Sequence, residues 1–202
     1  MTYREAITYL NSFINYENKD TYPYKKLFKL EGIQGFLMRI GNPQESLKCL
    51  HIAGTKGKGS VCIFAASILR EAGYTVGLYT SPHLLDWRER IRVLRRTKDE
   101  GRKMMDVFQG MISKRELAGL VNRLKPYIEE YNRISKYGSV TLFEVYTALA
   151  FVYFKEQKVD YAVLETGLGG RLDATNTVNP LVCGITPISY DHMDKLGTTL
   201  RQ

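Results

Sequence analysis

A loop rich in glycine and lysine carries the residue types best suited to chemistry in this chain of 202 residues. It consists of Gly54, Thr55, Lys56, Gly57, Lys58, Gly59 and Ser60. The apolar run Cys49–Ala53 before it predicts a buried strand, and the apolar segment Val61–Leu69 after it predicts a buried helix. In such a unit, backbone N–H groups and the positive end of the helix dipole face an anion, which Lys58 would neutralise. The loop is therefore predicted to bind the phosphates of a nucleotide.

The spacing of this loop departs from the usual phosphate-binding pattern. That pattern has a glycine where Ile52 stands and a hydroxyl group where Gly59 stands, whereas here the hydroxyl group comes one position later, at Ser60. A turn rich in glycine, lysine and serine that binds no phosphate is the alternative. We favour a nucleoside triphosphate site, because the flanking strand and helix supply the context that a phosphate loop requires.

Three further predicted strands are each followed or ended by a side chain that can bind a metal. These are Ser81 after Tyr74–Tyr79, Glu165 within Val159–Thr166, and His192 after Leu181–Thr186. In a parallel sheet the carboxyl ends of all strands lie at one edge, beside the phosphate loop, and an acidic residue there is typical of magnesium binding. Taken singly, Glu165 could be a solvated acid at a strand end, and His192 a loop histidine bonded to the backbone. Their joint occurrence favours a shared Mg²⁺ site.

The elements that position these residues alternate between helices and strands. Helices are predicted at Thr2–Tyr16, at Lys25–Ile40 before Gly41-Asn42-Pro43, at Ser113–Ser135 with Pro126 kinking or breaking it, and at Thr141–Phe154. Lys19–Tyr24 is predicted as a polar turn, Arg88–Val93 as a short extended segment, and Arg95–Gly110 as a mobile insertion. Ser113 with Glu116, and Thr141 with Glu144, have the spacing of a helix capping box. The pattern predicts an α/β fold with three layers and a mostly parallel sheet covered on both faces.

Composition indicates one globular domain, with 44% hydrophobic and 25% charged residues. No apolar run is long enough to span a bilayer, and the N-terminus does not resemble a signal peptide. The three cysteines, Cys49, Cys62 and Cys183, lack the spacing of a metal site. We expect them to be small core residues of a cytoplasmic protein.

The net charge of +8 comes mostly from one segment, Arg88–Lys103, which has eight basic and three acidic residues. A solvated basic loop is the first interpretation, an anionic small-molecule site the second, and nucleic-acid binding the third. We therefore expect neither a nucleic acid nor a membrane as a partner.

Ordered motifs along the chain resemble the N-terminal ATPase domain of folylpolyglutamate synthase and dihydrofolate synthase, which are relatives of the Mur ligases. The motifs are Gly41–Gln44, His51–Ser60, Thr80–Leu84, Glu89–Ile91, Thr141–Glu144, Glu165–Asn176 and Asp191–Gly197. They extend from about the second predicted helix to the end of the chain. The resemblance implies a Mur-ligase-like phosphate-loop domain over residues 1–202, as part of a longer enzyme.

The resemblance also implies roles for individual residues. Gly57–Ser60 would hold the phosphates of ATP, and Ser81, Glu165 and His192 would bind Mg²⁺. Lys58, Glu165 and His192 would then be catalytic. The residues that would line the pterin site are Leu30, Glu31, Thr141, Phe143, Glu144, Leu172, Asp173 and Ala174. For Glu144 this role and the capping role can both hold.

The implied reaction is the ATP-dependent addition of L-glutamate to a carboxylate of a folate or of dihydropteroate. The carboxylate takes the γ-phosphoryl group of ATP, and the amine of glutamate attacks the acyl phosphate. Lysine and magnesium would offset the charge on the transferred group. The motifs leave open which of the two substrates is used.

In the family a helix with a carbamylated lysine and a C-terminal domain that helps bind ATP and glutamate follow the segment matched here. We therefore expect residues 1–202 alone to bind nucleotide weakly, to form little amide product and to self-associate, whereas the full-length enzyme would be monomeric. Two other functions stay open at this point. One is a non-catalytic nucleotide-binding remnant of the family, and the other is a nucleic-acid-binding ATPase that uses the basic segment.

Overall fold

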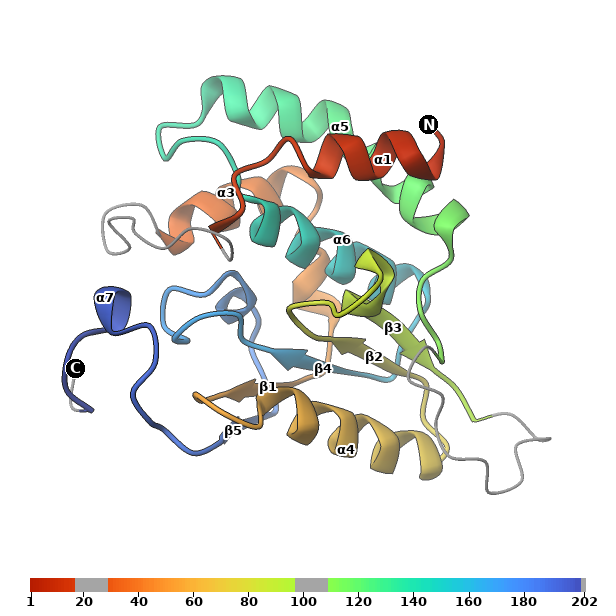
Figure 1. Ribbon diagram of the computed structural model, residues 1–202. Coiled ribbons are helices and arrows are strands. Elements are labelled where there is room, and N and C mark those ends of the chain that lie inside the picture. Colours follow the sequence, from red (N-terminus) through yellow and green to blue (C-terminus); the bar gives the residue numbers. More distant parts are fainter. Residues whose placement is uncertain (17–28, 97–108, 201–202) are drawn as a thin grey trace.

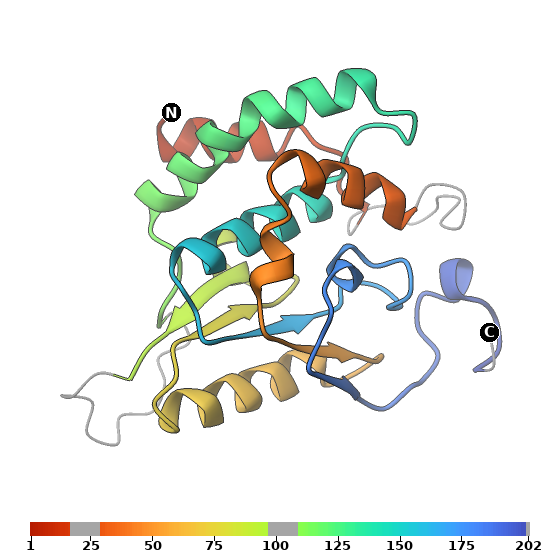
Figure 2. The same cartoon turned by 180° about the vertical axis from the view of Figure 1, so that it is seen from behind.

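The computed structural model describes residues 1–16, 29–96 and 109–200, which form an α/β fold around a five-stranded sheet (Figures 1 and 2). The strand order is β3-β2-β4-β1-β5. The strands are β1 (Cys49–Ala53), β2 (Val76–Tyr79), β3 (Ile91–Leu94), β4 (Tyr161–Glu165) and β5 (Val182–Ile185). β1 pairs in parallel with β4 and β5, and β2 pairs in parallel with β4. The predicted α/β class and mostly parallel sheet are confirmed.

β3 is the one antiparallel strand among the described residues, and it pairs with β2 along Val76–Tyr79. The chain between them is a short loop with the 3-10 turn Trp87–Arg90, too short for the helical crossover that parallel neighbours need. The extended segment predicted at Arg88–Val93 is therefore a turn followed by a strand.

Helices lie on both faces of the sheet (Figure 1). They are α1 (Tyr3–Leu10), α3 (Leu30–Arg39), α4 (Lys58–Glu71), α5 (Lys114–Ile134), α6 (Leu142–Glu156) and the single turn α7 (Met193–Leu196). Short 3-10 turns lie at Pro43–Ser46 and Ala174–Thr177. α4 covers one face, and α6 and α3 lie over the other, with α1 and α5 beyond them (Figure 2). The larger core cluster fills that second side, and a smaller one lies between the sheet and α4.

The predicted helix ends are confirmed where a capping residue marks them. Ser113 and Glu116 form a capping box at the start of α5, and Thr141 and Glu144 form one at α6. α5 runs through Pro126 without a break. Proline removes one backbone hydrogen bond, but seven buried side chains hold this helix to its neighbours, so packing outweighs that loss.

The predicted bounds of the first helix are too long. The first helix ends at Leu10 and not at Tyr16, and the described part of the second begins at Leu30. The polar turn Lys19–Tyr24, the first residues of Lys25–Ile40 and most of the insertion Arg95–Gly110 lie outside the described residues.

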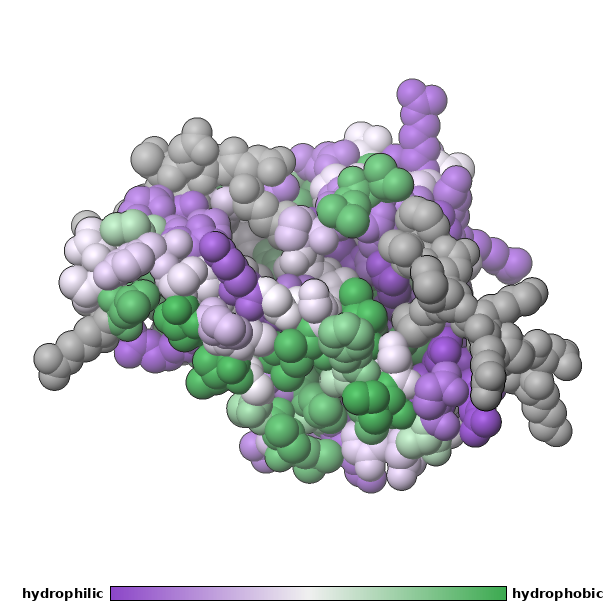
Figure 3. Space-filling model, turned by 60° about the horizontal axis from the view of Figure 1, so that its bottom comes forward, coloured by the Kyte–Doolittle hydropathy of each residue, from purple (hydrophilic) through white to green (hydrophobic). Residues whose placement is uncertain are grey.

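The prediction that Val61–Leu69 is a buried helix is wrong for its outer side. Only Cys62, Ala66 and Arg70 of α4 are buried, while Phe64 is 68% exposed. Apolar side chains gather on the face that carries α4 and β5, as the space-filling view from below shows (Figure 3). The exposed members are Val61, Ile63, Phe64, Ile68, Leu181, Val182 and Ile185. Cys183 on β5 is likewise exposed, which corrects its assignment to the core, whereas Cys49 and Cys62 are buried as predicted.

The basic segment is only partly solvent-exposed in its described part, where Arg95 and Arg96 are exposed. Arg88 forms an ion pair with Asp86 at 2.8 Å, and Arg90 and Arg92 are buried. Arg95 donates to the side chain of Gln157 at 2.8 Å. Arg88, Arg90 and Arg92 are thus paired or buried within the fold, so the segment carries less free positive charge than the sequence suggests. No helix in the described ranges has both the length and the apolar content needed to cross a bilayer.

Candidate functional site

The predicted phosphate loop joins β1 to α4, as its sequence context indicates. Gly57 has a φ of +82°, a left-handed conformation that glycine adopts without strain, and it turns the chain into α4 at Lys58. The N-cap residue Gly57 has no side chain to cap this helix start, and of the first N–H groups that of Gly59 interacts with the Glu165 carboxyl group. The uncapped N–H groups and the positive end of the helix dipole therefore face the mouth of the loop, which is the arrangement that favours phosphate.

Lys58 curls back over its own loop, where its Nζ donates to the carbonyl oxygen of Thr55 at 3.3 Å. The loop is also tied to the segment after β5. Thr55 N donates to Pro187 O at 3.2 Å, and Ser189 N donates to Thr55 Oγ1 at 3.1 Å. These bonds fix the path of the loop, so that the lysine is held near the helix start.

Glu165 lies at the carboxyl end of β4, directly against the phosphate loop. Its Oε2 accepts from Ser81 N at 3.1 Å, and an ideal Cβ on Gly59 would lie 3.4 Å from the same oxygen. Burial raises the pKa of the Glu165 carboxyl group, while the N–H of Ser81, the charge of Lys58 and the N–H of Gly59 oppose that shift. The predicted meeting of Ser81, Glu165 and the phosphate loop at one sheet edge is found.

The loop that carries Ser81 is held by the two residues before β3. The Glu89 carboxylate accepts from the N–H groups of Leu84, Leu85 and Asp86 at 2.6 to 2.8 Å. Burial alone would raise the pKa of Glu89, but these N–H groups bring it below its usual value. Arg90 donates from Nε to His83 Nδ1 at 3.0 Å. Glu89 and Arg90 belong to the motif Glu89–Ile91, and the structure gives them a positioning role that the sequence did not indicate.

His192 is placed less closely than the other two predicted metal ligands. It precedes α7 with a φ of +46°, its side chain is about half exposed, and its Nε2 lies 3.9 Å from Asp191 Oδ1. Within the described residues no three His, Cys, Asp or Glu side chains cluster as a metal site. The predicted set of Mg²⁺ ligands consists of one Glu and one His side chain together with the hydroxyl group of Ser81. The hard oxygen donors of Ser81 and Glu165 fit Mg²⁺, and the complete ligand set stays a prediction.

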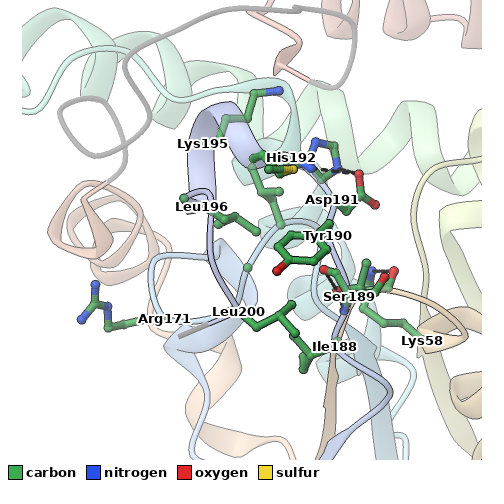
Figure 4. A pocket seen from close by; sticks show the side chains of 18 of the residues that line it. Lys58, Arg171, Ile188, Ser189, Tyr190, Asp191, His192, Lys195, Leu196 and Leu200 are labelled. Carbon is green, nitrogen blue, oxygen red and sulfur yellow. Dashed lines mark hydrogen bonds and ion pairs between the residues drawn. The ribbon is translucent and has the colours of Figure 1, made fainter. Parts of the chain in front are cut away.

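A cavity of about 400 Å³ opens between the phosphate loop and the segment after β5 (Figure 4). Gly54, Thr55 and Lys58 line one side of it. The residues that follow β5 line another, and Tyr190 lies between His192 and Leu200 in this view. The predicted phosphate-binding residues Lys56, Gly57, Gly59 and Ser60 are not among its lining residues. The cavity is large enough for a nucleotide-sized ligand.

A second cavity, of about 260 Å³, lies beside the first. The predicted substrate-binding residues that line it are Thr141, Phe143, Glu144, Leu172, Asp173 and Ala174. Leu30 and Glu31 begin α3 and do not line this cavity. Thr141, Phe143 and Glu144 come from the N-cap and first turn of α6, and Leu172, Asp173 and Ala174 from the glycine-rich segment after β4. Side chains far apart in the sequence therefore form one apolar pocket with a few polar groups, which is typical of a small-molecule site.

Two carboxyl groups of this cavity are engaged within the protein. Glu144 Oε2 accepts from Thr141 N at 2.7 Å, and the Glu144 N–H donates to Thr141 Oγ1 at 3.3 Å, so the capping role is confirmed. Burial raises the pKa of Glu144. Burial also raises the pKa of Asp173, against hydrogen bonds from Thr175, Leu168 and Gly167. Glu144 thus caps α6 and also faces the cavity.

The sequence did not point to Tyr16 and Lys195 as lining residues of the second cavity. The Lys195 side chain is only 7% exposed, although it lies in a short helix near the end of the described chain. Tyr16 follows the first helix, and its pKa is raised by burial and by the nearby Glu144. Lys195 belongs to the motif Asp191–Gly197, but neither that motif nor the local sequence around Tyr16 indicates that the two side chains meet at this cavity.

We expect Gly167→Ala to destabilise the protein through a clash with Phe143. A Cβ at Gly167 would lie 2.6 Å from Phe143 Cζ, so the ring or the loop must move. Such overpacking costs about 1–3 kcal/mol of unfolding free energy, which denaturant titration measures. Gly119→Ala on α5 is the control, because nothing lies within 4 Å of its added Cβ. Phe143→Leu should remove part of the Gly167→Ala cost, and a fully additive double variant would contradict the clash.

No protein-family model matches the chain. It is 45% identical over 168 residues to a dihydrofolate synthase/folylpolyglutamate synthase of Bacillus subtilis, a match that covers 82% of this chain and 35% of that protein. A folylpolyglutamate synthase of Arabidopsis thaliana is 38% identical over 210 residues, covering 98% of this chain and 30% of its own length.

Solved structures give the same result. A folylpolyglutamate synthase complex with AMPPCP and folate has a TM-score of 0.82 at 33% identity, over 99% of this chain and 43% of that chain. Folylpolyglutamate synthase of Thermotoga maritima has a TM-score of 0.76 at 37% identity, over 96% and 41%. The chain thus spans less than half the length of these relatives. It is a relative of the folylpolyglutamate and dihydrofolate synthases, as its motifs predicted.

Proposed function

We propose that this chain is the ATP- and folate-binding part of a ligase that joins L-glutamate to a folate or dihydropteroate carboxylate. The observation that carries the proposal is that the two cavities share a wall. Five residues line both of them: Gly167, Leu168, Leu172, His192 and Lys195. A nucleotide in the first cavity and a pteridine compound in the second would therefore meet along that wall, where phosphoryl transfer to a carboxylate requires them.

The described residues suit the first half of this reaction. Lys58 and the N–H groups at the start of α4 would bind the β- and γ-phosphates, and the substrate carboxylate oxygen would attack the γ-phosphorus as ADP leaves. Ser81, Glu165 and His192 would hold Mg²⁺, which supplies further neutralisation of the phosphoryl charge. The amine of glutamate would then attack the acyl carbon and release phosphate. The cavity walls would keep water from the acyl phosphate until that attack.

The proposal also covers the compartment and the assembly. Three cysteines without disulfide partners are consistent with a reducing cytoplasm. The exposed apolar face of α4 and β5 supports self-association of residues 1–202, whereas the complete enzyme would be a monomer. Size-exclusion chromatography with light scattering distinguishes a monomer from a self-associated chain.

Titration calorimetry of residues 1–202 tests the proposal directly. We expect AMPPCP to bind in the presence of Mg²⁺, and folate or dihydropteroate to bind to the nucleotide-loaded chain. Amide product from ATP, Mg²⁺, L-glutamate and either substrate is expected to be slight in a mass assay of this chain alone. Binding of nucleotide without either pteridine compound would favour the non-catalytic remnant instead.

The nucleic-acid alternative makes a separate prediction. It requires affinity for DNA or RNA that falls steeply with salt and disappears when Arg95 and Arg96 are neutralised together with Lys98, which lies outside the described residues. The pairing or burial of Arg88, Arg90 and Arg92 leaves fewer free cations for such binding. We expect no salt-dependent retardation of DNA or RNA by the chain.

A further inference from the structure

A buried polar side chain, His51, lies on β1 just before the phosphate loop and has no role in the function proposed above. It is 7% exposed, and its Nε2 lies 2.7 Å from Thr175 Oγ1. Thr175 is fully buried, and its hydroxyl group donates to Asp173 Oδ1. Because a threonine hydroxyl has one proton and gives it to the carboxylate, the His51 ring must be the donor from Nε2. The hydrogen bonds thus run in one direction, from His51 through Thr175 to Asp173.

Asp173 connects this hydrogen-bond chain to the backbone of the glycine-rich segment. Its Oδ2 accepts from Gly167 N and from Leu168 N, each at 2.9 Å, and its Oδ1 accepts from Thr175 N at 3.0 Å. Each oxygen atom of the Asp173 carboxylate thus accepts two hydrogen bonds from the protein. Loss of the Thr175 hydroxyl group would leave the His51 N–H and one carboxylate position without partners in a buried site, where such loss is costly.

One end of this hydrogen-bond chain lies near the phosphate loop, and the other lies in the wall shared by the two cavities. His51 pairs in register with Leu164 of β4 and is three residues before Gly54, where the phosphate loop begins. Gly167 and Leu168 line both cavities. His51 and Thr175 themselves line neither cavity. They therefore act on a ligand only through the backbone that they hold.

We propose that His51 and Thr175 are positioning residues, which through Asp173 fix the Gly167–Leu168 backbone as the shared wall of the nucleotide and pteridine cavities. The proposal rests on the proposed function for the identity of the ligands. The connection itself does not depend on them. It gives β1, and with it the phosphate loop, a fixed position relative to the wall along which the two ligands would meet.

Amide hydrogen exchange on residues 1–202 tests the connection with a matched pair of variants. Thr175→Val keeps the shape of the side chain and removes the hydroxyl group, whereas Thr175→Ser keeps the hydroxyl group. We expect exchange at Gly167 and Leu168 to rise about tenfold or more in Thr175→Val, with no change at Val163 in β4, and to stay as in the wild type in Thr175→Ser. His51→Gln, which can place an amide N–H near the Nε2 position, should keep most of the protection, and it serves as the second variant if Thr175→Val does not fold.

Calorimetry with AMPPCP and Mg²⁺ on the same variants tests the effect on the site. Thr175→Val is expected to bind the nucleotide about tenfold more weakly than Thr175→Ser. Unchanged exchange at Gly167 and Leu168, or a uniform rise across the whole sheet, would overturn the positioning role, and so would lost protection with unchanged affinity. If the wild type binds no nucleotide, the proposed function fails, and the exchange data alone then decide whether the connection exists.

Discussion

Replacing Lys58 with alanine will weaken the binding of AMPPCP and Mg²⁺ by about ten- to a hundredfold, because charge-assisted hydrogen bonds contribute about 1.5–3 kcal/mol each. Lys58 is the cation that lies at the start of α4 and lines the first cavity. Lys58 Nζ donates to the carbonyl oxygen of Thr55, whereas the bonds from the loop to Pro187 and Ser189 are made by Thr55, so removing the lysine side chain leaves them in place. Titration calorimetry measures the loss.

Lys48→Ala is the matched control for charge. Lys48 is exposed just before β1, at the opposite end of that strand from the phosphate loop. The Lys48→Ala variant should bind the nucleotide as the wild type does, and both variants should have an unchanged midpoint of thermal unfolding. Equal nucleotide affinity in Lys58→Ala and the wild type would mean that the loop is a glycine-rich turn without a phosphate site.

Glu165→Gln is expected to remove most of the contribution that Mg²⁺ makes to nucleotide binding. Glutamine keeps the size of the side chain and an oxygen that can accept from Ser81 N, but it lacks the charge that attracts the metal. The ratio of the AMPPCP dissociation constants measured without and with Mg²⁺ should be at least about tenfold smaller in Glu165→Gln than in the wild type. Glu45→Gln, at an exposed position in the turn after α3, is the control.

Stability separates a metal-binding role of Glu165 from a structural one. Burial raises the pKa of Glu165, so the charged form costs the folded state free energy at pH values above that raised pKa. Glutamine removes this cost, and Glu165→Gln is therefore not expected to lower the free energy of unfolding at neutral pH. A large loss of stability together with an unchanged effect of Mg²⁺ would show that Glu165 only supports the fold.

Local patterns in the sequence were enough to predict most of the framework. β1, the phosphate loop and α6 lie where the apolar runs and the Thr141–Glu144 capping box place them. The meeting of Ser81 with Glu165 followed from the rule that parallel strands end at one edge. These features depend on contacts close in sequence or on a general property of parallel sheets.

Features that depend on the whole fold were not predictable in the same way. The Val61–Leu69 part of α4 is apolar almost all round, and periodicity cannot tell that Phe64 faces outward while Ala66 is buried. Arg90 reads as one of a run of charges, but tertiary packing places it against His83 and the ring of Tyr146. His51 lies within a predicted strand, and its partner Thr175 is 124 residues away.

The central claim is that the phosphate loop, Ser81 and Glu165 hold one metal–nucleotide complex beside the second cavity. Diffraction from crystals of this chain grown with AMPPCP and Mn²⁺ tests it most directly, because the anomalous signal locates the metal. We expect Mn²⁺ between the phosphates and the oxygen atoms of Ser81 and Glu165, with Lys58 Nζ on a phosphate oxygen. Phosphates seated away from the Gly54–Ser60 loop, or a metal in contact with neither Ser81 nor Glu165, would contradict it.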